Sequence, residues 1–350
     1  MQEVMIGSSR QYPPGKPLLL RRNAEIVSTG AGLPDEIVTN QDLIDELGLI
    51  ATARAVEFSI GIRERRRAEY SVAPSFYLEK AARECIQRAN VAPEQIDRII
   101  YARLFGDHFI PATALRVLER LGIRRGIPVM DISAACSGVM HAVEIALGFI
   151  NAGDRYVLVL GGDRTAMGKE IAVKKDTRTV FLNGDGFAGI LLGYSSTPKF
   201  LARYFYTDSD LSDFAYIPFG TELLNKTHAF GPAMLALTMP DGKSIHQSVL
   251  DSCRLITARL LQLAQLQIED IDFVITSDQT YLVWQEQLRI LGVPQEKSIS
   301  CFPRYGNTVA AMVPLNLNEA IVTGALKRGM KVLMMGHGAG ASGGGFIFTY

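Results

Sequence analysis

Four cysteines are the residues of this sequence best suited to nucleophilic chemistry, and one of them has an unusual setting. Cys136 lies in the segment 131–138, between an apolar run that predicts a strand and a long apolar stretch that predicts a helix. Small residues flank the thiol, so a substrate can approach it closely. The amides and the dipole of a helix that begins here favour a thiolate. Because a thiolate attacks acyl carbonyls, the sequence predicts Cys136 as the nucleophile of an acyl transfer.

The other three cysteines, Cys85, Cys253 and Cys301, are expected to be inert buried thiols, as most free cysteines are. A buried, inert Cys136 is the alternative to the nucleophile. The spacing of the four fits no C-x-x-C pattern, so we expect no metal site. Reduced thiols in a chain of 350 residues indicate a cytoplasmic protein.

Composition excludes several other classes of function. The formal net charge is +0, with 36 basic and 36 acidic residues, whereas nucleic-acid binders usually carry a basic surplus. The first residues are polar and lack the apolar core of a signal peptide. No apolar run approaches the ~20 residues that span a bilayer, so we expect no membrane partner. A hydrophobic content of 48% indicates a globular protein with a large core.

The elements that must position Cys136 repeat along the chain. Two pairs of apolar runs match in order at one offset of 175 residues, half the chain length: 97–100 with 272–275, and 157–161 with 332–336. Each run reads as a buried parallel strand, and Gly153 and Gly329 end the helices before the second pair. The sequence therefore predicts a tandem duplication, with halves at 1–197 and 198–350.

Strands and helices are expected to alternate, which is typical of an α/β fold with buried sheets. Strands are expected near 24–30, 97–102, 128–132 and 273–276, with two closing strands at the C-terminus and a hairpin-like segment at 180–192. Helices are expected near 40–47, 74–89, 137–152, 244–266, 285–291 and 310–326. No low-complexity linker separates the halves, so we expect them to pack on each other.

Five ordered motifs resemble those of the ketoacyl-acyl-carrier-protein synthase III branch of the thiolase superfamily. They are 61–66 (Gly-Ile-Arg-Glu-Arg-Arg), the nucleophile segment 131–138, 183–189 (Asn-Gly-Asp-Gly-Phe-Ala-Gly), 305–311 (Tyr-Gly-Asn-Thr-Val-Ala-Ala) and the glycine-rich 338–340. The resemblance implies a thiolase-like fold, a duplicated five-layer α-β-α-β-α architecture with two mixed sheets, usually assembled as a dimer. It also implies that Cys136 accepts an acyl group and that the backbone amides of Cys136 and Gly340 form the oxyanion hole.

The sequence departs from this family at its third catalytic group. The family has a His in an H-Q-A-N motif, and the matching segment 276–281 reads Thr-Ser-Asp-Gln-Thr-Tyr, with Asp278 at the His position. Asn307 is kept, so the apparent triad is Cys136, Asp278 and Asn307. An ionised Asp would repel a malonyl carboxylate by ~4 kcal/mol at ~4 Å and an effective dielectric near ~20. Ordinary decarboxylative condensation is therefore disfavoured. A general base and a protonated hydrogen-bond donor are the open alternatives for Asp278.

Residues that would contact coenzyme A in the family also differ. By spacing, Ala55, Ser59 and Val283 replace a stacking Trp, a nucleotide-contacting Arg and a carrier-docking Arg. Arg63 and Arg65 could still meet a phosphate or an acidic carrier protein, with a solvated charged face as the alternative. The donor is therefore expected to be an acyl thioester of coenzyme A or of a carrier-bound phosphopantetheine.

Three further residues are candidates for the acyl pocket. In the resembling family, the loop that contains Phe109 and Ile110 neighbours the acyl pocket across the dimer, so these side chains could limit acyl length. A simple packing role is the alternative. His337 precedes the glycine-rich segment and could approach the active site, although a structural role would fit the same position.

The leading hypothesis is an acyltransferase that moves an acyl group through Cys136 to a small-molecule acceptor, in fatty acyl, polyketide or specialised metabolite biosynthesis. It needs no permanently bound cofactor, and its expected assembly is a homodimer, with a heteromer as the alternative. The second hypothesis is a catalytically degenerate supporting subunit of a heteromeric thiolase-fold complex, which the loss of the His would fit.

Overall fold

The computed structural model describes residues 12–123, 126–165, 177–219 and 237–350, and two mixed sheets form its framework. The first sheet has the strand order β1-β7-β6-β4-β5. Its strands are β1 (Asn23–Ala31), β4 (Arg98–Ala102), β5 (Val129–Ile132), β6 (Tyr156–Asp163) and β7 (Gly186–Ser195). β4 runs parallel to β5 and β6, whereas β7 runs antiparallel to β1 and β6. β4 and β6 are almost wholly buried and apolar because helices cover both faces of the sheet.

The second sheet has the order β8-β11-β10-β9. Its strands are β8 (Phe200–Thr207), β9 (Phe273–Ile275), β10 (Lys331–Gly338) and β11 (Ser342–Thr349). β9 and β10 run parallel, and β11 runs antiparallel to β10 and β8. A separate two-stranded ribbon is formed by β2 (Glu36–Thr39) and β3 (Glu64–Arg67). The boundary expected between residues 197 and 198 falls between β7 and β8, and it stays a prediction.

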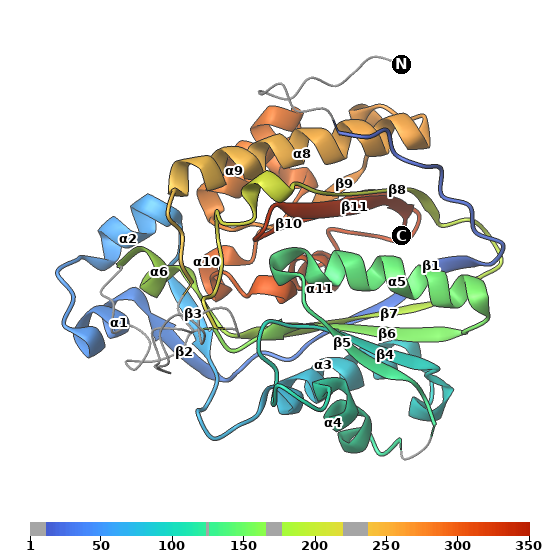
Figure 1. Ribbon diagram of the computed structural model, residues 1–350, viewed down its shortest axis with the longest axis horizontal. Helices are drawn as coiled ribbons and strands as arrows, with labels where there is room; N and C mark the ends of the chain where they lie inside the picture. The colour runs from blue at the N-terminus through green and yellow to red at the C-terminus, as the bar shows by residue number, and fades with distance from the viewer. Residues whose placement is uncertain (1–11, 124–125, 166–176, 220–236) are drawn as a thin grey trace.

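Helices complete five layers, as the sequence predicts (Figure 1). α5 (Gly138–Ala152) and α11 (Met312–Val322) lie between the two sheets and contact both. α3 (Pro74–Ala89) and α4 (Thr113–Arg120) cover the outer face of the first sheet, and α8 (Gly242–Ala264) and α9 (Tyr281–Leu291) cover the second. The remaining helices, α1 (Asn40–Leu47), α2 (Ala53–Ile60), α6 (Thr177–Leu182) and α10 (Phe302–Tyr305), lie beside the two-stranded ribbon.

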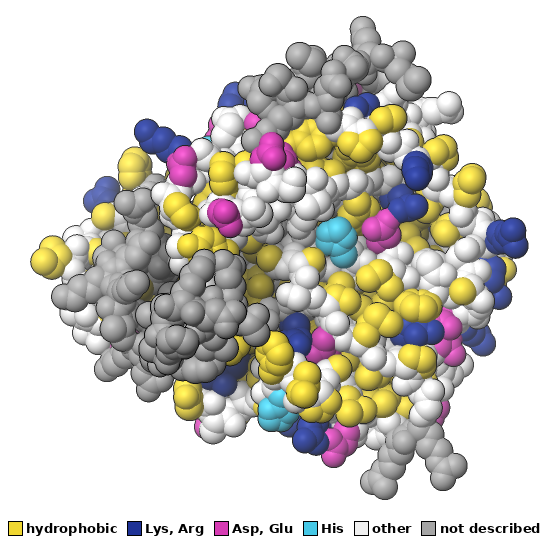
Figure 2. Space-filling model, in the orientation of Figure 1, with side chains coloured by type: hydrophobic (Ala, Val, Ile, Leu, Met, Phe, Trp, Pro, Cys, Tyr) yellow, Lys and Arg dark blue, Asp and Glu magenta, His cyan; other side chains and the backbone are white. Residues whose placement is uncertain are grey.

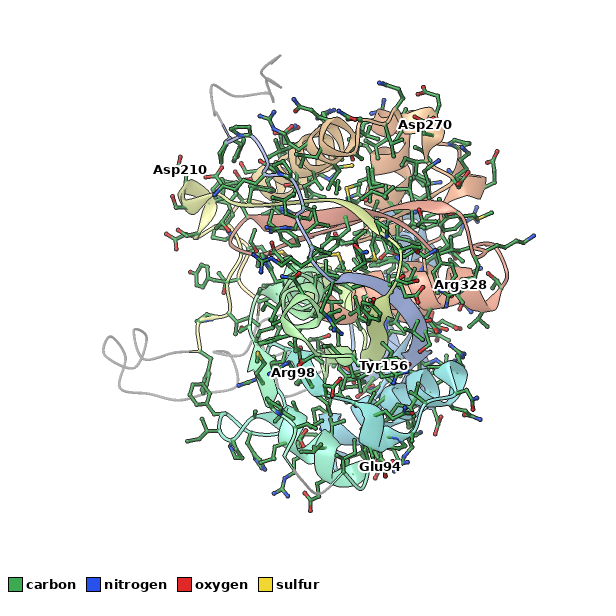
Figure 3. The ribbon with its side chains drawn as sticks, turned by 90° about the vertical axis from the view of Figure 1, so that its right-hand side faces the viewer. Glu94, Arg98, Tyr156, Asp210, Asp270 and Arg328 are labelled. Carbon is green, nitrogen blue, oxygen red and sulfur yellow. The ribbon has the colours of Figure 1, made fainter. Side chains whose placement is uncertain are left out.

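The predicted duplication extends to the strand register. Arg98 pairs with Val157 between β4 and β6, and Phe273 pairs with Val332 between β10 and β9. Both pairs keep the offset read from the sequence. An Asp precedes each first strand and plays the same part, since the Asp97 carboxylate accepts from Tyr156 N and the Asp272 carboxylate from Lys331 N. Figure 3 shows Glu94 and Asp270, which precede the matching strands, at opposite outer ends of the molecule.

Two expectations about local structure were wrong. The segment 180–192 is no hairpin, because α6 continues to Leu182 and one long strand, β7, follows. Phe181 is buried against Ile62 and Phe302, and this packing holds the apolar residues in a helix. The second concerns apolar length. No apolar run was expected to approach the ~20 residues that span a bilayer, but the stretch Ala135–Ala152 is long and apolar enough to cross a membrane by length and composition. Since α5 lies between the two sheets, it is the core helix of the fold.

Charges of both signs are interspersed on the face of the molecule shown in Figure 2. Acidic, basic and hydrophobic side chains alternate across this face, so the formal net charge of +0 does not divide into one acidic and one basic region there.

Replacing Gly184 by alanine should lower the free energy of unfolding by about 3 kcal/mol, because an added methyl group overpacks a closed site. A Cβ there would lie 1.9 Å from the Tyr305 carbonyl oxygen and 2.9 Å from the Arg65 Cβ. Urea denaturation checks this value. Gly148→Ala on α5 is the matched control, because its Cβ would meet no atom within 4 Å. The control should be neutral or more stable by up to ~1 kcal/mol; equal losses in both variants would contradict the packing argument.

Candidate active site

One cavity of about 1360 Å³ brings together most of the residues that the sequence singled out. Its wall draws on both halves of the chain: 103–109, 133–136 and 182–183 from the first, and 214–219, 237–249, 279–280 and 337–341 from the second. Cys136 and Asn307 both line it. The contribution of 214–219 and 237–249 was missed by the sequence analysis, since no motif marks these segments.

Cys136 lies in a tight turn between β5 and α5. The turn is a short 3-10 helix over Ala135–Ser137, and Ala135 takes a left-handed conformation with φ 47°. Such a φ is strained for a residue with a Cβ and is held only by its surroundings. The glycine-rich segment packs onto this turn, since a Cβ on Gly338 would lie 2.8 Å from Ser137 N. The backbone of Gly338 therefore lies directly against the nucleophile turn, with no room for a side chain between them.

The thiolate expected at Cys136 is not supported by its surroundings. Burial raises the pKa of the Cys136 thiol to about 12, a backbone hydrogen bond lowers it by less, and the charge of Asp163 raises it further. The α5 helix begins at Gly138, two residues after Cys136, so burial is the largest influence on the pKa of this thiol. The thiol is therefore protonated at neutral pH, and its attack on a carbonyl requires a group that takes up the proton.

Asn307 is fixed between the two halves of the chain. Its backbone N–H donates to Leu182 O at 2.8 Å, and its carbonyl accepts from Gly184 N at 3.1 Å. Its side-chain Oδ1 accepts from Val309 N at 2.8 Å. Because Oδ1 is held in this turn, the side-chain amide Nδ2 is the group that Asn307 can offer to the cavity as a donor.

Asp278 is placed differently from the expectation. It is buried and is absent from the cavity wall, whereas its neighbours Gln279 and Thr280 line the cavity. Its carboxylate accepts hydrogen bonds from the Ser300 hydroxyl, from Asn316 Nδ2 at 2.9 Å and from Phe302 N at 3.3 Å. These contacts turn Asp278 toward α10 and α11. The expected repulsion of a malonyl carboxylate by Asp278 therefore has no support in this geometry.

Burial raises the pKa of Asp278 to about 7, against the opposing effect of its hydrogen bonds with Ser300 and Asn316. A carboxyl group with a raised folded pKa binds its proton more tightly in the folded protein. Its contribution to stability is therefore present at low pH and is lost as the pH rises from about 4 to about 7. This loss amounts to at most about 4 kcal/mol.

Asp278→Asn should accordingly flatten the dependence of stability on pH. We expect the difference in unfolding free energy between pH 4.5 and pH 7.5 to change by up to about 4 kcal/mol relative to the wild type. Urea denaturation at the two pH values measures it. Asp163, whose pKa burial also raises to about 7, keeps its own contribution in this variant. An unchanged pH dependence in Asp278→Asn would mean that the carboxylate ionises without penalty.

The oxyanion-hole candidates come together at the cavity. Gly340, with φ 73°, and Ala341, with φ 45°, form the bend that follows β10, and both line the cavity with Cys136. Ser137 and Ser342 hydroxyls lie 2.9 Å apart across the same junction. The amides of Cys136 and Gly340 stay the predicted oxyanion donors. Ala339, in the middle of the glycine-rich segment 338–340, also lines the cavity.

Arg63 and Arg65 do not behave alike. Arg63 is exposed and is absent from the cavity wall, so its contact with a donor stays a prediction. Arg65 is only 1% exposed and donates to Val38 O, to Asn40 Oδ1 and to the carbonyl of residue 181. Arg65 also lines the cavity, so its expected contact with a donor phosphate stays a prediction, whereas its burial disfavours contact with the outer surface of a carrier protein. Its part is to fix the ribbon and α6 beside the cavity.

Phe109 and Ile110 are both 79% exposed, and Phe109 lines the cavity. Arg103 anchors the loop that contains them, because it donates to Phe109 O at 3.2 Å and forms an ion pair with Asp131 at 2.9 Å. Their role in limiting acyl length stays a prediction. Arg103 itself lines the cavity and was missed, since no spacing rule connects it to Cys136.

His337 lines the cavity and is 7% exposed. It lies on β10 directly before the glycine-rich segment, as expected. Its imidazole Nδ1 lies 2.9 Å from the Ser252 hydroxyl of α8. Nothing in the described residues tests its expected part in acyl or donor binding.

Two family models match this chain. The model for 3-oxoacyl-[acyl-carrier-protein] synthase III matches residues 130–209, and the model for the C-terminal part of the same synthase matches 261–350. The first match contains Cys136, and the second contains Asn307 and the glycine-rich segment. Of the cavity wall, residues 182–183 also lie within the first match, and residues 279–280 within the second.

Solved structures agree with the family models. The chain is similar to 3-oxoacyl-[acyl-carrier-protein] synthase III from Aquifex aeolicus VF5, with 28% identity, a TM-score of 0.82 and coverage of 94% of this chain and 100% of the other. It is also similar to the priming β-ketosynthase of the R1128 polyketide pathway, with 26% identity, a TM-score of 0.85 and coverage of 96% and 98%. A variant of OleA from Xanthomonas campestris, at 18% identity, a TM-score of 0.82 and coverage of 95% and 100%, shares the fold.

These likenesses confirm the thiolase-like α/β fold with two mixed sheets. By its two family matches over residues 130–209 and 261–350 and by its structural neighbours, the chain is similar to the synthase III enzymes of the thiolase superfamily.

Proposed function

We propose that this chain is an acyltransferase that takes an acyl group from a thioester donor onto Cys136 and passes it to a small-molecule acceptor. One observation carries the proposal: Cys136 is the one thiol of the four that reaches the cavity, and it does so at the turn onto which the glycine-rich segment packs. The Asn307 amide at the same cavity supplies a hydrogen-bond donor for a substrate carbonyl.

The relatives suggest the substrates. The Aquifex structure is named for an acyl-carrier-protein synthase, and the R1128 structure for the priming step of polyketide biosynthesis. We therefore propose an acyl thioester of coenzyme A or of carrier-bound phosphopantetheine as donor, in fatty acyl, polyketide or specialised metabolite biosynthesis. The proposed enzyme is cytoplasmic, needs no permanently bound cofactor and acts as a homodimer.

Asp278 supports this function from behind the cavity wall. Its hydrogen bonds with Ser300, Asn316 and Phe302 anchor the loop whose next two residues, Gln279 and Thr280, line the cavity. We propose that Asp278 positions this loop. Its side chain does not line the cavity, so this positioning role differs from the catalytic role of the His in the resembling family.

A supporting subunit without catalysis is the second candidate. The absence of His from position 278 and the high pKa of Cys136 favour it. Against it stand the place of Cys136 on the cavity wall and the Asn307 amide at the same wall. The two candidates differ in one measurable property, which is covalent loading.

Acyl loading tests the proposal. The purified chain is incubated with acetyl-, butyryl- and octanoyl-coenzyme A and with the matching acyl-pantetheines, and its intact mass is measured. A mass increase equal to the acyl group, mapped by peptide analysis to the segment that contains Cys136, is the expected result. No adduct with any of these donors would favour the supporting subunit.

A further inference from the structure

His337 differs from the other wall residues because a set of hydroxyl groups surrounds its imidazole. Nδ1 lies 2.9 Å from Ser252 Oγ and 3.4 Å from the Tyr206 hydroxyl, and Nε2 lies 3.5 Å from Ser248 Oγ. The backbone groups of His337 are also occupied, because its N–H donates to Ser277 Oγ and its carbonyl accepts from Gln279 Nε2. The ring is thus held in one orientation at the cavity wall.

The protons of these hydroxyl groups can be assigned by counting donors and acceptors. Ser252 has one hydroxyl proton, and it donates this proton to the main-chain carbonyl of Ser248 at 2.6 Å. The Tyr206 hydroxyl donates to Ser252 Oγ, whose second lone pair is left for Nδ1. His337 therefore carries its proton on Nδ1 and donates it to Ser252.

Nε2 is then left as an unprotonated acceptor. Its nearest hydroxyl, that of Ser248, gives its own proton to Ile245 O at 2.8 Å. Neither Ser248 Oγ nor Nε2 has a proton left to donate to the other, and the 3.5 Å between them is at the outer limit of a hydrogen bond. His337 and Ser248 both line the cavity, so a basic lone pair is left at the wall that Cys136 shares.

The electrostatic setting keeps this imidazole neutral. Burial lowers the pKa of His337 to about 4. Its neighbours on α8 are Ser248 and Ser252, and those between β9 and α9 are Ser277 and Gln279, none of which titrates.

Of the other titratable groups, Tyr206 contacts the ring, and Cys136 and His246 line the same cavity as His337. On β8, Tyr206 has a pKa that burial raises, so it keeps its proton at neutral pH. Across the cavity, the pKa of Cys136 is raised to about 12. His246 also lines the cavity but pairs with Glu286 at 3.0 Å.

We propose that His337 is a second catalytic residue, whose Nε2 takes the proton of a hydroxyl or amine acceptor as that acceptor attacks the acyl group on Cys136. This inference rests on the proposed acyltransferase function and names the acceptor class. Asp278 cannot play this part from its place behind the wall, whereas His337 lies at the wall itself.

The step balances without any further reactant. The lone pair of the acceptor oxygen or nitrogen attacks the carbonyl carbon of the Cys136 thioester, and the proton of the acceptor passes to Nε2. The tetrahedral intermediate collapses, the bond between carbon and Sγ breaks, and its electron pair returns to sulfur. The proton then passes from Nε2 to Sγ, which restores the neutral imidazole and the thiol and releases an ester or amide.

The assigned tautomer also explains why a protic acceptor fits better than a malonyl group. Decarboxylation of malonyl leaves an enolate oxygen, which needs hydrogen-bond donors. Nε2 without a proton accepts and cannot donate, so it would oppose the charge on such an oxygen. Toward an O–H or N–H group the same lone pair is a general base, an effect typically worth roughly 100-fold or more in rate.

Discharge of the loaded enzyme tests the proposal. Wild type, His337→Gln and His141→Gln are loaded with the donor that labels Cys136, freed from excess donor and mixed with water or a series of primary alcohols. The rate of loss of the acyl mass is followed between pH 5.5 and pH 8. His141 is the matched control, because it is a half-buried His on α5 that packs on Phe205 and is absent from the cavity wall.

Once loaded, His337→Gln is expected to discharge roughly 100-fold more slowly, with His141→Gln at the wild-type rate. The wild-type rate should be flat over this pH range, since the imidazole is neutral throughout, whereas the variant rate should rise in proportion to hydroxide. Ser252→Ala, which keeps the ring but removes the Nδ1 acceptor, should give an intermediate rate.

Three results would overturn the inference. Equal discharge rates for wild type and His337→Gln would remove His337 from the step while leaving the acyltransferase proposal intact. Loss of loading in His337→Gln, with an unchanged unfolding temperature, would place His337 in the first half-reaction instead. If no donor loads the wild-type chain, both this inference and the proposed acyltransferase function are wrong.

Discussion

Cys136→Ala should abolish the covalent acyl adduct altogether, because it removes the one thiol that a donor in the cavity can reach. Cys85, Cys253 and Cys301 are buried in the sheet and helix packing and are absent from the cavity wall. Burial raises the pKa values of their thiols as it raises that of Cys136, so access to the cavity is what distinguishes Cys136. Intact mass after incubation with acyl thioesters measures the loss.

Cys253→Ala is the matched control for this prediction. The side chain lies in the core between α8 and the second sheet, so the substitution removes a buried thiol without touching the cavity. The variant should load as the wild type does, at some cost in stability. An adduct that survives in Cys136→Ala but disappears in Cys253→Ala would place the nucleophile elsewhere and end the proposed function.

Alkylation of Cys136 by iodoacetamide should be slow at neutral pH and should rise about tenfold with each pH unit up to pH 10. The reactive species is the thiolate, and burial raises the pKa of this thiol from 9.0 to about 12. At pH 8 this shift lowers the thiolate fraction by roughly a thousandfold relative to an unperturbed cysteine. Mass spectrometry at a series of pH values gives the rate.

Free N-acetylcysteine, measured under the same conditions, is the reference for this prediction. Its alkylation rate should level off about one pH unit above the ordinary cysteine pKa of ~8.5, whereas that of Cys136 should continue to rise. A rate for Cys136 that reaches its plateau below pH 9 would show that a group in the cavity takes the thiol proton before any substrate arrives. The nucleophile would then be preformed, as the sequence alone suggested.

Local and periodic features of this protein could be read from the sequence. The offset of 175 residues predicted the strand pairing of both halves, because the strands that pair side by side are the same apolar runs in each copy. The turn at Cys136 was equally predictable. It needs small residues between a strand and a helix, and those residues are adjacent in the chain.

Directions of side chains in the site could not be read in this way. The motif in the resembling family places its His at position 278, where this sequence has Asp, and that correspondence stays a prediction. The side chain of Asp278 turns to Ser300 and Asn316, which lie 22 and 38 residues further along the chain. A motif fixes which residue follows a strand, but packing against other elements decides which way that residue points.

The sequence by itself determined the duplicated α/β architecture, the place of the nucleophile turn and the family resemblance, because each depends on residues near one another or on a repeated pattern. Only the tertiary structure decided the pKa of Cys136, the withdrawal of Asp278 from the cavity and the hydroxyl groups around His337. The physical reason is that desolvation and hydrogen bonding depend on atoms that folding brings together: Ser252 lies 85 residues from His337 in the chain and 2.9 Å from it in space.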